Sequence, residues 1–214
     1  ITGVGVLPHD ARMAEVMDAQ DGLYTLVEKA PDGSTSARVI GSIVEYLYAP
    51  DDPDAVLDKL ADPRTRIVSL TVTEGGYNFN QATGLFDETT PAVAHDLEVL
   101  RGSGEGELRS VFGLVVDAVR VRRERGTAPF TVMSCDNIQG NGHMARSTFL
   151  AYAQLRDPEL AAWIESNTRF PNSMVDRITP ATPPELAAEV AALVRAGAEH
   201  ALELLAGSLA LAVA

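Results

Sequence analysis

Cysteine, positive charge and long apolar runs are all scarce in this sequence. Cys135 is the single cysteine among 214 residues, which excludes an internal disulfide and any metal site built on several thiolates, and is typical of a reducing cytoplasm. The 17 Lys and Arg residues face 30 Asp and Glu, a formal charge of −13 that disfavours nucleic acids and anionic membranes as partners. The apolar end at 201–214 is shorter than the ~20 residues that cross a bilayer, and no signal peptide is visible. We therefore expect a cytoplasmic protein with neither kind of partner.

Hydrophobic residues make up 46% of the chain, enough for one large domain. Apolar runs of strand length occur at 1–7, 66–72 and 130–134, and segments of helical periodicity separate them. This alternation predicts an α/β fold with a largely parallel sheet flanked by helices, in which 66–72 is buried on both faces. Between residues 23 and 49, two extended segments flank the turn PDGSTS, a pattern that indicates a hairpin.

Start and stop signals place the helices between these strands. Pro158 after Asp157 is typical of a helix beginning, and Gly126 after an arginine-rich turn is typical of a helix end. Thr182 and Glu185 form a capping box in front of an Ala-rich helix that would fill the C-terminal tail. The helices expected before it span 10–22, 51–63, 91–101, 108–126, 142–155 and 157–167.

Ligands of open parallel sheets bind at the carboxyl ends of the strands, so polar residues there are candidate site residues. Asp10 follows the first strand, where a carboxylate can accept hydrogen bonds from a ribose; a helix N-cap is the alternative. The preceding Gly3-Val4-Gly5 is not a dinucleotide fingerprint, because Pro8 stands where the third glycine belongs.

Two further strands also end in polar residues. Glu74, in TEGG, can carry a proton or accept a hydrogen bond from a sugar hydroxyl, and a solvent-facing acid in a turn is the alternative. Asn137, in SCDN, can donate from its amide to an oxygen that gains charge during reduction, and an Asx turn is the alternative.

Other arrangements are less consistent with the sequence. The four histidines show no metal-ligand spacing with one another or with Cys135, so no metal site is expected. A nucleophilic pair of Cys135 and His143 lacks the local signatures of cysteine hydrolases. The cluster of Arg122, Arg123 and Arg125 can bind phosphate or lie in solvent at a helix end.

Four segments together resemble one family. GVGV with HDARM, RIVSLTVTEGGY, FTVMSCDNIQGNGHMAR and FPNSMVDRITP are similar to the long-chain mannitol dehydrogenases, polyol-specific enzymes related to fructuronate and tagaturonate reductases. The resemblance spans about residues 1–185 in the family's order. It implies a zinc-independent interconversion of a polyol and a ketose with NAD as cofactor, a Rossmann-type first domain and a mainly helical second domain.

The resemblance also implies roles for individual residues. It places Asp10 on the adenosine ribose, which favours NAD over NADP, and Glu74 beside a proton path to the catalytic base. Asn137 would lie beside the cofactor and polarise the reacting oxygen, and Val175 and Asp176 would line the nicotinamide and substrate region.

The sequence departs from the family at both ends. The family's first strand and its G-x-G-x-F-H-R-A-H turn do not precede Ile1, and its catalytic K-x-x-x-L-N-x-x-H pattern is not found. We therefore expect residues 1–181 to form an incomplete Rossmann-type NAD-binding domain and 182–214 a helical tail that diverges from the family. Such a fragment of a polyol dehydrogenase is expected not to interconvert mannitol and fructose by itself.

Two alternatives stay open at this stage. The substrate of the parent enzyme can be a hexuronate instead of a polyol, which would require a cationic contact for its carboxylate. The chain can also be a non-catalytic regulatory protein that forms oligomers through the tail, with a surface made of Leu202, Leu205, Leu209 and Leu211. The sequence does not fix the oligomeric state.

Overall fold

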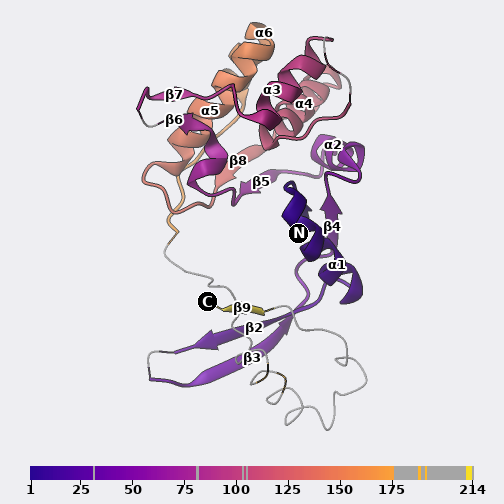
Figure 1. Ribbon diagram of the computed structural model, residues 1–214, viewed down its shortest axis with the longest axis vertical. Coiled ribbons are helices and arrows are strands. Elements are labelled where there is room, and N and C mark those ends of the chain that lie inside the picture. The colour runs from indigo at the N-terminus through magenta and orange to yellow at the C-terminus, as the bar shows by residue number, and fades with distance from the viewer. Residues whose placement is uncertain are drawn as a thin grey trace. The chain divides into compact units, whose positions relative to one another are not determined.

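The computed structural model describes residues 1–30, 32–80, 82–102, 104, 106–175, 188, 191 and 211–213. The chain divides into two compact units, one of residues 1–48 with 177–214 and one of residues 49–176. Figure 1 labels the α-helices and most of the strands of each unit.

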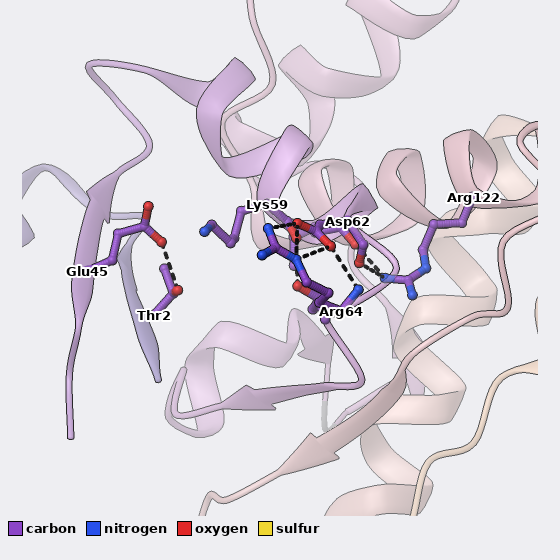
Figure 2. A network of polar contacts seen from close by, with 8 residues as sticks. Thr2, Glu45, Lys59, Asp62, Arg64 and Arg122 are labelled. Carbon is purple, nitrogen blue, oxygen red and sulfur yellow. Dashed lines mark hydrogen bonds and ion pairs between the residues drawn. The ribbon is translucent and has the colours of Figure 1, made fainter.

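The first unit is built on a pair of parallel strands and a hairpin. Strand β1 (Thr2–Gly5) pairs in parallel with β4 (Glu45–Tyr48), and the 3-10 helix η1 (Pro8–Asp10) and helix α1 (Ala11–Ala19) follow β1 directly. The Thr2 hydroxyl donates to the Glu45 carboxylate across this pair (Figure 2). The hairpin of β2 (Tyr24–Lys29) and β3 (Thr35–Ile40) is antiparallel, as predicted.

The second unit contains the other parallel pair, β5 (Ile67–Leu70) and β8 (Thr131–Ser134). Between these strands the chain forms the 3-10 helix η2 (Glu74–Tyr77), a short hairpin of β6 (Phe79–Asn80) and β7 (Leu85–Phe86), and two helices, α3 (Pro91–Leu100) and α4 (Val111–Glu124). Helix α2 (Pro53–Ala61) precedes β5, and α5 (Asn141–Arg156) and α6 (Pro158–Asn167) follow β8.

Local capping explains where several of these helices begin. The side chains of Asp52, Ser110 and Asp157 accept hydrogen bonds from backbone amides in the first turns of α2, α4 and α6. Pro53 and Pro158 occupy the first helical position, where the missing amide hydrogen has no intrahelical partner to lose. The start signal predicted at Asp157 and Pro158 is therefore confirmed.

The core of the second unit surrounds helix α4, in which nine residues are buried. Aromatic rings from β7, α4 and α5 pack together in this core. The ring of Phe86 meets that of Phe112 edge-on with centroids 5.1 Å apart, and the rings of Phe112 and Tyr152 stack with centroids 5.9 Å apart. These contacts hold the helical layer beside β8 and so fix the position of the strand's carboxyl end.

Arg122 is buried at the end of α4, which contradicts both a phosphate site and a solvated helix end at this residue. Its guanidinium donates to the carbonyl oxygens of Leu60 at 2.7 Å and Asp62 at 3.1 Å, at the end of α2 (Figure 2). It also donates to the Ala128 carbonyl and lies 5.0 Å from the centroid of the Phe130 ring. Arg122 therefore satisfies helix-end carbonyls that have no intrahelical partner.

The α/β class with parallel strand pairs flanked by helices is confirmed, but two details of the expectation are wrong. Ile67 is 60% exposed, so β5 is not buried on both faces. Leu211–Val213, which was expected to be helical, is instead a strand, β9, that pairs in parallel with β2. Thr182, Glu185 and the other tail leucines lie outside the described residues. Within the described part of the chain, no helix is long and apolar enough to cross a membrane.

Candidate functional site

The carboxyl ends of β5 and β8 are joined by one buried carboxylate, that of Asp136. Its Oδ1 accepts the Thr73 amide at 2.9 Å, and its Oδ2 accepts the Val72 amide at 3.2 Å and the Tyr77 hydroxyl at 2.7 Å. The Tyr77 hydroxyl also lies 2.6 Å from the hydroxyl oxygen of Ser134, which is fully buried. Residues 72–77 are therefore attached at both ends to Asp136, the second residue after β8.

Tyr77 is a neutral hydrogen-bond donor in this arrangement. Burial raises the pKa of its hydroxyl above the ordinary value of 10, and the neighbouring negative charge of Asp136 raises it further. The hydroxyl therefore stays protonated around neutral pH, which allows it to donate to the carboxylate.

Glu74 opens the short helix η2, and its side chain is exposed at this edge of the pair. Gly75 faces open space, while a Cβ atom on Gly76 would lie 2.7 Å from the Val72 side chain. Gly75 also lines an open cavity of about 210 Å³ together with residues 78–80, 87 and 90. Of the two glycines, Gly75 leaves room beside the backbone and Gly76 allows close packing.

Asn137 follows Asp136 directly and is exposed, so its amide lies at the same strand edge as the η2 segment. The chain then turns at Gly140, whose φ of 69° is in the left-handed region that favours glycine, and α5 begins. The structure therefore brings Glu74 and Asn137 to the ends of two neighbouring parallel strands, where a ligand of an open sheet binds.

Residues 171–175 are fixed against the beginning of α5. The Asn141 side chain, only 1% exposed, donates to the carbonyls of Asp136 and Ser173 and accepts the Ser173 amide. Asn172 accepts the amide of Gly142 at 2.9 Å, capping the helix from a distant segment. A Cβ atom on Gly142 would lie 2.3 Å from the Pro171 carbonyl oxygen, so only glycine permits this approach.

Val175 ends this segment as a half-buried residue, one position after Met174, whose side chain is 90% exposed. The segment that contains Val175 is thus attached to the end of β8 through Asn141 and Ser173. Asp176 lies outside the described residues.

Asp10 belongs to the first unit and does not cap α1. Its Oδ2 instead accepts the backbone amides of Val6 at 2.9 Å and Leu7 at 2.8 Å, just after β1. Asp10 thus occupies the N-cap position of α1, but its carboxylate makes no capping hydrogen bond to that helix. Oδ1 is 3.8 Å from the His9 ring, and the side chain is 31% exposed, so one carboxylate oxygen can accept hydrogen bonds from a ligand.

Sequence reasoning missed three buried polar residues beneath this edge, Ser134, Asp136 and Asn141, and the exposed Asn172 that caps α5. The pattern of a polar residue shortly after a buried strand marks Asp136 as well as Asn137, but the donors that Asp136 binds lie 59 to 64 residues away in the sequence. No group of three or more His, Cys, Asp or Glu side chains in the described ranges could hold a metal ion.

A family model described as the mannitol dehydrogenase Rossmann domain matches residues 1–206. The polyol:NADP oxidoreductase of Gluconobacter oxydans (strain 621H) is 53% identical over 189 residues, which cover 87% of this chain and 38% of that protein. The mannitol 2-dehydrogenase of Cereibacter sphaeroides is 48% identical over 184 residues, 86% of this chain and 37% of that protein. The chain thus spans little more than a third of the length of these curated relatives.

Two solved structures share the fold. A substrate-free D-sorbitol dehydrogenase superposes with a TM-score of 0.86 at 47% identity, covering 100% of this chain and 41% of that one. The mannitol 2-dehydrogenase of Pseudomonas fluorescens, solved as a ternary complex with NAD and D-mannitol, gives a TM-score of 0.83 at 42% identity, covering 90% of this chain and 38% of that one. The chain belongs to the mannitol dehydrogenase family and corresponds to its Rossmann-type domain.

Proposed function

We propose that this chain is the nucleotide-binding part of an NAD-dependent polyol dehydrogenase that interconverts a polyol such as mannitol and a ketose such as fructose by hydride transfer. The observation that carries the proposal is the edge formed by the parallel strands β5 and β8. There, Glu74 follows Thr73, whose amide Asp136 binds, and Asn137 follows Asp136 itself. Membership in a family of polyol oxidoreductases supports the same activity.

Each exposed residue at this edge has a distinct chemical task. The Asn137 amide donates a hydrogen bond to the substrate oxygen, which becomes more negative while the carbonyl is reduced. The Glu74 carboxylate accepts and passes on the proton that leaves or enters the substrate hydroxyl. Val175 contributes apolar surface beside the reacting carbon, and Asp176 would complete that wall.

In the first unit, the Asp10 carboxylate fits the adenosine ribose of NAD. Asp10 keeps one oxygen for the Val6 and Leu7 amides and has the other for the adenosine ribose hydroxyls. NAD, when bound, supplies the hydride acceptor for polyol oxidation. The negative charge of Asp10 repels the additional phosphate of NADP, so we propose NAD as the preferred cofactor, although one relative is named for NADP.

The general base of this reaction is not among the residues of this chain. Its two lysines, Lys29 and Lys59, stand in no K-x-x-x-L-N-x-x-H pattern. We therefore propose that the 214-residue chain binds the nucleotide without turning over mannitol or fructose, and that the division at residue 181 separates the nucleotide-binding part from the tail.

Fluorescence titration with NADH tests the proposal. We expect saturable binding by the chain, weaker binding by Asp10→Ala, and unchanged binding by the matched control Asp18→Ala, which changes an exposed acid of α1. Equal affinities of all three proteins would remove the ribose assignment. A steady-state assay that detects NADH-dependent fructose reduction by the pure chain would refute the absence of turnover.

A further inference from the structure

The backbone before Glu74 is in an unfavourable conformation. Thr73 has φ 63° and ψ 171°, although a β-branched residue avoids positive φ. Asn78, at the other end of η2, has φ 50°. These are two of the three non-glycine residues with positive φ in the described part of the chain, so the strain is concentrated around the short helix that begins with Glu74. Such strain persists only where the surrounding structure holds it in place.

Asp136 supplies the contacts that hold this conformation. Its carboxylate accepts the amide of Thr73 itself, the amide of Val72 before it and the hydroxyl of Tyr77 at the end of η2. The Asp136 residue is 9% exposed, so water is a poor substitute for these three donors. A carboxylate suits the position because both of its oxygens accept, whereas an amide would turn an NH₂ group toward one of the donors.

We propose that Asp136 is a positioning residue: its carboxylate holds the Thr73 backbone at positive φ and so places Glu74 at the strand edge next to Asn137. The inference rests on the proposed function for the roles of Glu74 and Asn137. The statement that Asp136 holds the Thr73 backbone does not depend on that function. Glu74 directly follows Thr73, whose amide Asp136 binds, and Asn137 directly follows Asp136. One buried group therefore sets the relative placement of both exposed side chains.

Amide hydrogen exchange of the ¹⁵N-labelled 214-residue chain tests the proposal. Asp136→Asn is expected to accelerate exchange of the 72–77 amides about 10-fold, because the lost charge weakens hydrogen bonds that hold a local segment. Exchange in α2 is expected to stay within about twofold of the wild-type rate. Asp87→Asn changes a turn carboxylate of the same unit that accepts hydrogen bonds from Thr89, and it serves as the matched control.

A second substitution separates positioning from general stabilisation. Thr73→Gly removes the cost of positive φ while deleting an exposed side chain, so in the Asp136→Asn background it is expected to return part of the protection of the 74–77 amides. Merely additive effects of the two changes would overturn the proposal. So would unchanged exchange at 72–77 in Asp136→Asn, or acceleration that is equal throughout α2 and η2.

If Asp136→Asn does not fold, Tyr77→Phe removes one of the three donors and keeps the carboxylate, and it is expected to accelerate the same amides about 10- to 30-fold. Unchanged exchange in that variant would contradict the proposal. Glu74→Gln alters the exposed acid but not the hydrogen bonds of Asp136, so it is expected to leave the exchange pattern unchanged. None of these readouts depends on NADH binding, so a failure of the proposed function is recognised separately by the titration.

Discussion

Two buried tyrosines in the second unit lead to opposite expectations for the same substitution. The Tyr77 hydroxyl donates to the Asp136 carboxylate and contacts Ser134, whereas the Tyr152 hydroxyl has no hydrogen-bond partner among the described residues. A hydrogen bond to a charged group stabilises a protein by about 1.5–3 kcal/mol. Tyr77→Phe is therefore expected to lower the free energy of unfolding by about 2 kcal/mol. Tyr152→Phe removes a buried, unpaired hydroxyl. It is expected to raise the free energy of unfolding or to leave that energy unchanged within about 0.5 kcal/mol.

Urea unfolding of the two variants measures this difference. The single tryptophan, Trp163, lies in α6 of the same unit, so its fluorescence reports the unfolding of the part that contains both tyrosines. Equal slopes of free energy against urea concentration would show that the variants differ in stability and not in the compactness of the unfolded chain. Equal destabilisation by Tyr77→Phe and Tyr152→Phe would refute this prediction, because it would mean that the hydroxyl bound to Asp136 contributes no more than the unpaired hydroxyl of Tyr152.

Three further predictions concern other contacts of the second unit. Gly142→Ala is expected to destabilise the unit by about 2 kcal/mol in urea unfolding, because the added methyl group would overlap the Pro171 carbonyl; an unchanged midpoint would contradict this close approach. Arg122→Met is expected to cost about 3 kcal/mol in the same assay, since it leaves several carbonyl oxygens without a donor, and a neutral effect would show that water replaces the guanidinium. The hydrogen bonds from Arg64 lower the pKa of Asp62 to about 2, so the stability that this pair contributes is present above pH 3.8, the ordinary pKa, and is lost as the pH falls toward 2. An NMR titration is expected to show the Asp62 pKa rising toward 3.8 in Arg64→Gln, and an unchanged pKa would argue against the pair.

The parts of the fold that sequence reasoning predicted are those that local chemistry determines. Asp157 and Pro158 define the beginning of α6 within a few residues of sequence, and the turn between β2 and β3 lies between two apolar segments. Each of these signals acts through contacts between residues that are close in the sequence, so it can be recognised without knowing any distant partner.

The parts that were predicted wrongly depend on distant partners or on competing local bonds. Leu211–Val213 is a strand because it pairs with β2, which lies at the other end of the sequence. Asp10 has an N-cap's position, but its carboxylate binds the amides before it and not those of α1. Arg122 has the sequence context of a solvated helix end, and only the folded chain brings the carbonyls of Leu60 and Asp62 to it.

The candidate site shows the same division. Glu74 and Asn137 were predicted from their positions after apolar strands, because strand ends are visible in the sequence. The buried residues that place them were not predicted, since the hydrogen bonds of Asp136 span 59 to 64 residues of sequence. An aspartate shortly after a strand looks the same in sequence whether it faces solvent or is buried between two strand ends.

The most direct test of the account is a map of the NADH binding site by ¹⁵N NMR of the 214-residue chain. The account predicts that saturating NADH shifts the amide signals of residues 6–10, 72–77 and 135–140 most strongly, and that Asp10→Ala weakens binding without moving the other two groups of shifts. Shifts confined to the exposed arginines 123 and 125 at the end of α4, or no binding at millimolar NADH, would contradict it.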